Sequence, residues 1–149
     1  MGIRSTQIRR RGAIRLLALA LLAIAAVLVC GRWTQKNQAK LLTNEDRLAY
    51  LAQMGWTAEE IPVAEQVVQL PKEFPPVLEQ YNTLQIQQGF DLKAYRGKEV
   101  TMYTYRLLEY PSPPEQGDVY ACLYVYRGTV IGGDVHTASM MGFMHGLKR

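Results

Sequence analysis

One uninterrupted apolar segment near the N-terminus, Leu16 to Cys30, restricts what this 149-residue chain can fold into more than any other feature. Arginines precede it and further basic residues follow it. As a helix, residues 13–31 extend about 28 Å, close to the roughly 30 Å of a bilayer's hydrocarbon core. More positive charge lies before the segment than after it, which favours a cytoplasmic N-terminus. We therefore expect an uncleaved single-pass anchor in the cell membrane.

This interpretation divides the chain into four parts. Residues 1–12 are a basic cytoplasmic tail, 13–31 the transmembrane helix, 32–42 a short tether and 43–149 an extracytoplasmic domain. The last part is long enough for one modest hydrophobic core.

Two alternatives remain open for the apolar segment. A signal peptide also has a basic start and an apolar centre, and cleavage after Ala25 or Gly31 would release the domain as a secreted protein. Lipidation at Cys30 is the other alternative, although Val29 is bulkier than the small residue that usually precedes a lipidated cysteine. Mass spectrometry of the native N-terminus distinguishes these cases.

The charge distribution argues against a nucleic-acid partner. Residues 1–40 contain eight of the 17 lysines and arginines and no acid, which leaves nine cations against 13 acids in the remainder. The domain is thus near −4, although the whole chain is formally +4. A nucleic-acid-binding protein needs a basic patch on its folded part. The expected partners are instead the lipid bilayer, which a basic tail suits, and a protein at the cell surface.

Local signals predict two helices in the domain. The first begins at Thr43, where Asp46 completes a capping box, and ends at Gly55 before Trp56. The second follows Pro75 and Pro76 and ends near Gly89. Its apolar residues recur at helical spacing, at Val77, Tyr81 and Leu84 with Leu78 beside them.

The remaining segments read as strands. We expect them at residues 65–70, 99–110, 119–126 and 130–135, with a tight hairpin at Arg127–Gly128–Thr129. Residues 119–126 are apolar or aromatic on both faces, which is typical of a central strand. The fold class is therefore α+β, with an antiparallel sheet of about four strands, two helices packed on one face and the order α-β-α-β-β-β.

Four separated blocks of this sequence resemble a known family. They are residues 45–48 with Gly55–Trp56, residues 88–92 with 95–98, residues 130–135, and residues 142–147. Together they are similar to the uncharacterised bacterial family called domain of unknown function 4830. The resemblance implies a small Firmicute protein with an N-terminal membrane segment, and it implies no activity and no catalytic residue.

Three residues could in principle form a metal site. His136 and His145 are the only histidines, and with Asp134 they would supply two imidazoles and one carboxylate. Their loose spacing is equally consistent with a polar strand end and a surface histidine. We expect no cofactor, and we assign no catalytic or metal-binding residue from the sequence.

Other motifs favour structural roles. Gly132–Gly133 lacks the strand-to-helix context and the lysine of a phosphate loop. Inside a strand, the two glycines predict a bulge or a close contact between their backbone and Trp56 or Tyr81. Cys122 reads as a small buried residue. The apolar tail formed by Met140, Met141, Phe143 and Met144 reads as a strap across the core, with partner binding as the alternative.

Three functional hypotheses follow. The first is a membrane-anchored, non-catalytic module that binds or scaffolds a partner outside the cytoplasm. The second is a small cell-surface hydrolase or metal-dependent enzyme that uses Asp134, His136 and His145, which requires these side chains to converge. The third is a cleaved, secreted domain.

Overall fold

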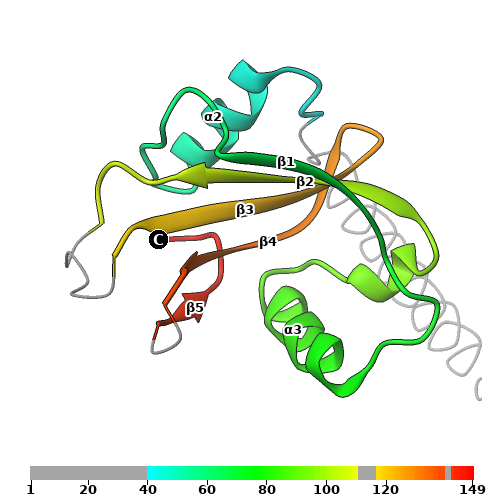
Figure 1. Ribbon diagram of the computed structural model, residues 1–149. Coiled ribbons are helices and arrows are strands. Elements are labelled where there is room, and N and C mark those ends of the chain that lie inside the picture. The colour runs from blue at the N-terminus through cyan, green and yellow to red at the C-terminus, as the bar shows by residue number, and fades with distance from the viewer. Residues whose placement is uncertain (1–39, 111–116, 140–141) are drawn as a thin grey trace, which may run out of the picture. The chain divides into compact units, whose positions relative to one another are not determined.

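The computed structural model describes residues 40–110, 117–139 and 142–149. All of these residues belong to one compact unit, Ala39–Arg149 (Figure 1). Its helices are α2 (Asn44–Gln53), α3 (Pro76–Gln87) and the short 3-10 helix η1 (Leu92–Tyr95). Its strands are β1 (Ala64–Gln69), β2 (Glu99–Arg106), β3 (Val119–Tyr126), β4 (Thr129–Thr137) and β5 (Met144–His145).

The predicted anchor, residues 13–31, and the basic tail lie outside the described residues. Within the described ranges, no helix combines the length and the apolar character needed to cross a membrane. The end of the predicted tether is described, and it belongs to the domain: Leu41 is buried in the core and its N–H donates to the Gly128 carbonyl over 2.6 Å. The domain therefore begins before Thr43.

Helix α2 begins and ends where local chemistry places it. The Thr43 side chain accepts from the Asp46 N–H, and the Asp46 carboxylate accepts from the Thr43 N–H at 3.0 Å, which completes the predicted capping box. Gly55 follows with φ +95°, and Trp56 folds back so that its N–H donates to the Leu51 carbonyl. Both ends of the first predicted helix are thus confirmed.

The sheet is an antiparallel meander of five strands in the order β1-β2-β3-β4-β5. The extra strand relative to the predicted four is β5, which pairs Met144 with His136 and His145 with Val135. Strands β3 and β4 are joined by the predicted tight turn, in which Arg127 and Gly128 both have positive φ. Strand β2 ends at Arg106, earlier than the predicted Tyr110.

The two helices cover opposite faces of the sheet, so the prediction that both pack on one face is wrong (Figure 1). On one face, Leu51 of α2 belongs to the core that contains Ala121 and Leu123 of β3. On the other face, Tyr81 of α3 lies against Tyr124 of β3. Because β3 alternates apolar side chains to both faces, each face needs its own cover.

Candidate functional site

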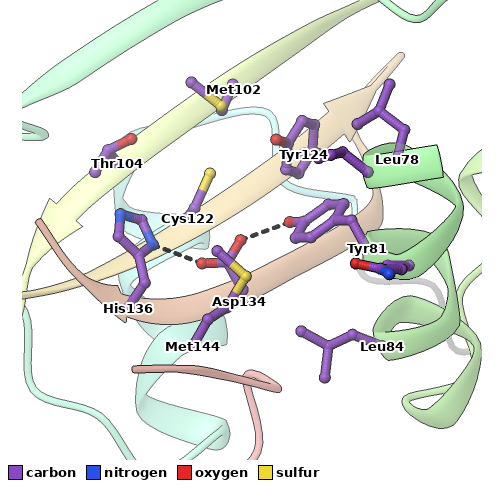
Figure 2. Close-up of a pocket in the computed structure, with 12 residues that line it drawn as sticks. Leu78, Tyr81, Leu84, Met102, Thr104, Cys122, Tyr124, Asp134, His136 and Met144 are labelled. Carbon is purple, nitrogen blue, oxygen red and sulfur yellow. Dashed lines mark hydrogen bonds and ion pairs between the residues drawn. The ribbon is translucent and has the colours of Figure 1, made fainter. Parts of the chain in front are cut away.

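A groove of about 660 Å³ lies between α3 and the face of the sheet that this helix covers. Its floor comes from strands β2, β3 and β4, and Met144 of β5 lies at one side (Figure 2). Most of the lining is apolar, and apart from Gln80 and Tyr81 of α3 the polar groups lie on the floor. The lining residues are Val77, Leu78, Gln80, Tyr81, Leu84, Met102, Thr104, Cys122, Tyr124, Asp134, His136 and Met144.

Three side chains, one from α3 and two from β4, form a hydrogen-bonded series at the floor. Asp134 is buried on β4, and its Oδ2 accepts a hydrogen bond from the Tyr81 hydroxyl at 2.5 Å. Its Oδ1 lies 2.6 Å from Nδ1 of His136 (Figure 2). Asp134 and His136 reach the same face because they are two residues apart on a regular strand. The buried carboxylate thus ties helix α3 to strand β4 and orients the imidazole.

Burial and hydrogen bonding shift the pKa values of His136 and Tyr81 in this hydrogen-bonded series. The hydrogen bond with Asp134 raises the pKa of His136 above its usual 6.5, against the opposing effect of burial. With Nδ1 engaged by the carboxylate, Nε2 has no hydrogen-bond partner among the described residues. Burial and the Asp134 charge together raise the pKa of Tyr81 far above its usual range, so this hydroxyl remains a donor.

The Cys122 thiol lines the same floor but is not activated. Burial first, and the negative charge of Asp134 second, raise its pKa well above that of a free thiol. A nucleophilic cysteine needs the opposite shift, toward the thiolate. The buried structural role predicted for Cys122 therefore fits its surroundings.

Helix α3 is attached to the domain by amide side chains. Asn82 and Gln85 are 2% and 0% exposed. Asn82 Oδ1 accepts from the Leu92 N–H at 2.8 Å, and Gln85 Oε1 accepts from the Gly133 N–H at 2.8 Å. Gln88 donates to the Gly133 carbonyl and accepts from the Leu147 N–H. Polar groups thus occupy the side of the helix that faces the protein.

The apolar side of α3 faces the groove instead. Val77, Leu78, Tyr81 and Leu84 all line it, and Val77 is 74% exposed. The predicted helical stripe is real, but apart from Tyr81 it does not enter the described core clusters. Sequence reasoning missed this because a second stripe, Asn82, Gln85 and Gln88 at three-residue spacing, is equally regular and carries no charge.

The structure separates the three residues of the hypothetical metal site. Asp134 and His136 lie in the α3 groove, whereas His145 pairs with Val135 and faces the α2 side. There His145 lies near the Trp56 ring, and its Nε2 is 3.1 Å from the Tyr110 hydroxyl. Among the described residues, no group of three His, Cys, Asp or Glu side chains is arranged to hold a metal ion.

Gly132 and Gly133 serve close packing, as predicted, but with different partners. A Cβ at Gly132 would meet Leu92 and Gln85, and one at Gly133 would meet Leu147 and the Cys122 carbonyl. The expected neighbour was Trp56 or Tyr81. A register shift does lie beside this pair, at Tyr124/Val125 of the neighbouring strand.

The residues of the predicted apolar strap do not all lie on one face of the sheet. Phe143 packs against the α2-side core, and Met144 lies opposite His136 at the groove with half of its surface exposed. Met140 and Met141 lie outside the described residues. Met144 and Met102 are groove residues that the sequence did not identify together, because only strand register brings β2 and β5 to one face.

Comparison with protein families gives a match. The family model described as Domain of unknown function (DUF4830) matches residues 50–135, which is more than half of the chain and includes α3 and the groove floor from β2 to Val135. No curated protein and no solved structure matches the chain.

Proposed function

We propose that this chain, which belongs to the family described as domain of unknown function (DUF4830), is a membrane-anchored binding module whose ligand docks in the α3 groove. The proposal places the domain outside the cytoplasm and assigns it no catalytic step.

The orientation of α3 carries the binding part of this proposal. A surface helix normally buries its apolar stripe and exposes its polar side. Here Asn82 and Gln85 are buried, while Val77 remains largely exposed at the groove. Leaving apolar surface such as that of Val77 in water forgoes about 25 cal/mol for each Å² that could have been buried. A ligand that covers the stripe recovers that free energy.

The anchor part is supported by the sequence of residues 13–31 and its flanking charges. An apolar segment long enough to cross the hydrocarbon core of a bilayer as a helix, preceded by several arginines, favours a cytoplasmic N-terminus and an exported domain. The lack of a polar stretch before Gly31 favours an uncleaved segment over a signal peptide.

The groove chemistry favours binding over catalysis. The Cys122 thiol is not an activated nucleophile, because burial and the Asp134 charge both raise its pKa. The enzyme hypothesis required His145 beside Asp134 and His136, and this residue faces the other side of the sheet. An Asp–His pair alone orients an imidazole, which can serve as a polar anchor for a ligand as readily as a base.

Hydrogen exchange of the full-length protein, measured with and without native membrane extract, tests the binding step. We expect slower exchange in 76–87 and 133–137 when the ligand is present, and no change in α2. Val77→Asp should abolish this protection, while Ile86→Asp, on the same helix but outside the groove lining, should retain it. Unchanged exchange in α3 would refute groove binding.

Two further measurements test the other parts. Protease treatment of intact cells should degrade a C-terminal tag and spare an N-terminal one, and the reverse pattern would overturn the topology.

The absence of a catalytic step is tested on the bound ligand. Ligand molecules that are bound by the wild type and by His136→Gln, and then released from each protein, should have the same masses. A product seen only with the wild type would show catalysis.

A further inference from the structure

Strand β1 is an edge strand that pairs, among the described residues, with β2 alone (Figure 1). At the opposite end of the sheet the backbone of β4 is covered. The amides of Gln85 and Gln88 engage the N–H and C=O of Gly133, and β5 pairs with the last part of the strand. An uncovered edge strand is a template for pairing with another strand. The two edges of this sheet are therefore not equivalent.

The hydrogen-bond pattern shows which backbone groups of β1 point outward. The Leu70 N–H donates to the Lys98 carbonyl over 2.9 Å, so Leu70 is bonded toward the β2 side. Along an antiparallel ladder, successive residues alternate between bonding to that neighbour and pointing away from it. The even-numbered residues of β1 therefore bond to β2, with which they are in regular register. Glu65, Val67 and Gln69 direct their N–H and C=O groups away from the sheet.

The side chains of β1 lack the usual protection of an edge. Natural edge strands commonly carry lysine or proline, which discourage pairing. Strand β1 has the sequence Ala-Glu-Gln-Val-Val-Gln, with a single charge at Glu65. Val67 is 64% exposed, and Ile61 and Val63 just before the strand are 78% and 51% exposed. Pairing along this edge would thus bury apolar surface as well as satisfy backbone groups.

The outward groups of β1 match those of a second copy in one register. Antiparallel pairing about a two-fold axis at Val67 places Val67 opposite Val67, and Glu65 opposite Gln69 on both sides of the axis. Every outward N–H and C=O of both strands then has a partner. The Gln69 amide can donate to the facing Glu65 carboxylate. No two like charges lie opposite each other, a pairing that would be destabilising.

Shifted registers use fewer of these groups. With the axis at Val68, Glu65 would lie opposite Pro71, which has no N–H to donate. With the axis at Gln66, Gln69 would lie opposite Val63, whose N–H already donates to the Thr104 carbonyl. With the axis at Glu65, two carboxylates would face each other. The Val67 register is therefore the favoured one.

We propose that two copies of this chain associate by antiparallel pairing of their β1 strands about Val67, which joins the two five-stranded sheets into one. The mode is β-strand addition, with backbone hydrogen bonds as the main contact. No residue of β1 lines the groove, so this inference goes beyond the proposed function and does not depend on it.

Thiol crosslinking of the full-length chain in its native cells tests the register. In a Cys30→Ser background, Val67→Cys should give a covalent dimer with the shortest bifunctional thiol reagents, because Cα atoms of a hydrogen-bonded pair are about 5.5 Å apart. Glu65→Cys is the matched control on the same exposed strand. Its two copies would be about 14 Å apart along the strands, and should not crosslink. Coexpression of Glu65→Cys and Gln69→Cys chains should restore the adduct, and its mass should equal two copies.

Substitution at the axis tests the contact itself in that coexpressed pair. Val67→Pro removes an outward N–H and leaves the bonds to β2 in place, since those come from the even-numbered residues. Val67→Lys places two cations opposite each other at an exposed position. Both should abolish the adduct, with circular dichroism to confirm the fold, and the Lys variant decides if the Pro variant unfolds. Val77→Lys, at an equally exposed valine of α3, should retain it.

Several results would overturn the inference. They are an adduct of Val67→Cys to a different protein, a dimer yield at position 67 no greater than at position 65, no dimer at all, or an adduct that survives Val67→Lys. None of these results bears on the groove, which the hydrogen-exchange experiment on α3 tests separately.

Discussion

The Tyr81 hydroxyl donates to the buried Asp134 carboxylate over 2.5 Å, and this single contact joins helix α3 to strand β4 across the floor of the groove. Tyr81 and Asp134 are 53 residues apart in the sequence. The carboxylate also holds His136 on its other oxygen, so the same residue positions both the wall of the groove and its polar anchor.

Tyr81→Phe should lower the free energy of unfolding by about 1–3 kcal/mol, because it removes a hydrogen bond from a buried, charged acceptor. Urea unfolding of the purified full-length protein, followed by circular dichroism, measures this loss. Tyr126→Phe is the control, since that ring packs against Tyr95 and its hydroxyl has no hydrogen bond among the described residues. Equal losses in the two variants would contradict the role of the Tyr81–Asp134 contact.

The raised pKa of His136 makes stability depend on pH in a defined direction. Because the folded state holds the imidazole proton more tightly than the unfolded state, the imidazolium stabilises the fold. This contribution is fully present below pH 6.5 and is lost as the pH rises through the folded-state pKa. The stability difference between wild type and His136→Asn should therefore be larger near pH 6 than near pH 9.

The cause of that shift can be tested in the same system. Asp134→Asn removes the carboxylate that engages Nδ1, so the pKa of His136 should fall. Proton NMR of the two histidines, with His145→Gln to assign the signals, follows each titration directly. A His136 titration that is insensitive to Asp134→Asn would show that another group causes the shift.

Gly133→Ala should be considerably more destabilising than Gly132→Ala. An added methyl at Gly133 would lie 2.4 Å from the Cys122 carbonyl oxygen, a backbone atom that cannot move alone. At Gly132 it would meet the ends of the Leu92 and Gln85 side chains, which can shift. We expect a loss of about 2–4 kcal/mol at Gly133, and a smaller one at Gly132. Thermal unfolding of the two variants gives the comparison, and similar melting temperatures would contradict it.

Asn82→Leu tests the polar attachment of α3. The substitution leaves the buried Leu92 N–H without its acceptor, so unfolding should become easier by about 1–3 kcal/mol despite the added apolar surface. Thr83→Ala, at the exposed neighbouring position, should change stability by less than about 0.5 kcal/mol. If Asn82→Leu instead stabilised the protein, the amide would not be the group that holds this helix in place.

The Cys122 thiol should resist alkylation in the folded protein. Burial and the Asp134 charge keep it protonated, and only the thiolate reacts rapidly. In a Cys30→Ser background, N-ethylmaleimide should label Cys122 slowly under native conditions and rapidly in urea. Rapid native labelling would show that the groove floor opens or that the thiol is more acidic than its surroundings imply.

Local signals account for the elements that sequence reasoning predicted well. The Thr43–Asp46 capping box, the Gly55–Trp56 stop and the positive φ of Gly128 each depend on neighbours within a few residues. Their chemistry is complete before any tertiary contact forms. The same holds for strand β3, whose bounds agree with the prediction because its composition alone is typical of a buried strand.

The candidate site depends on contacts that no local signal contains. Strand register decides that Asp134 and His136 face α3 while His145 faces α2, and a shift of one residue would reverse both. Local sequence signals likewise did not determine whether α3 buries its apolar stripe or its amide stripe. The amides of Asn82 and Gln85 are buried because their oxygens accept hydrogen bonds from the backbone N–H groups of Leu92 and Gly133.

The sequence by itself determined the α+β class, the antiparallel hairpin, the ends of the first helix and the family to which the chain belongs. These depend on short-range chemistry and on patterns along the chain. Only the tertiary structure decided that the helices lie on opposite faces and that Tyr81, Asp134 and His136 meet in one groove. The physical reason is that strand pairing brings distant residues together, and the energetic advantage of one pairing over another belongs to the whole sheet.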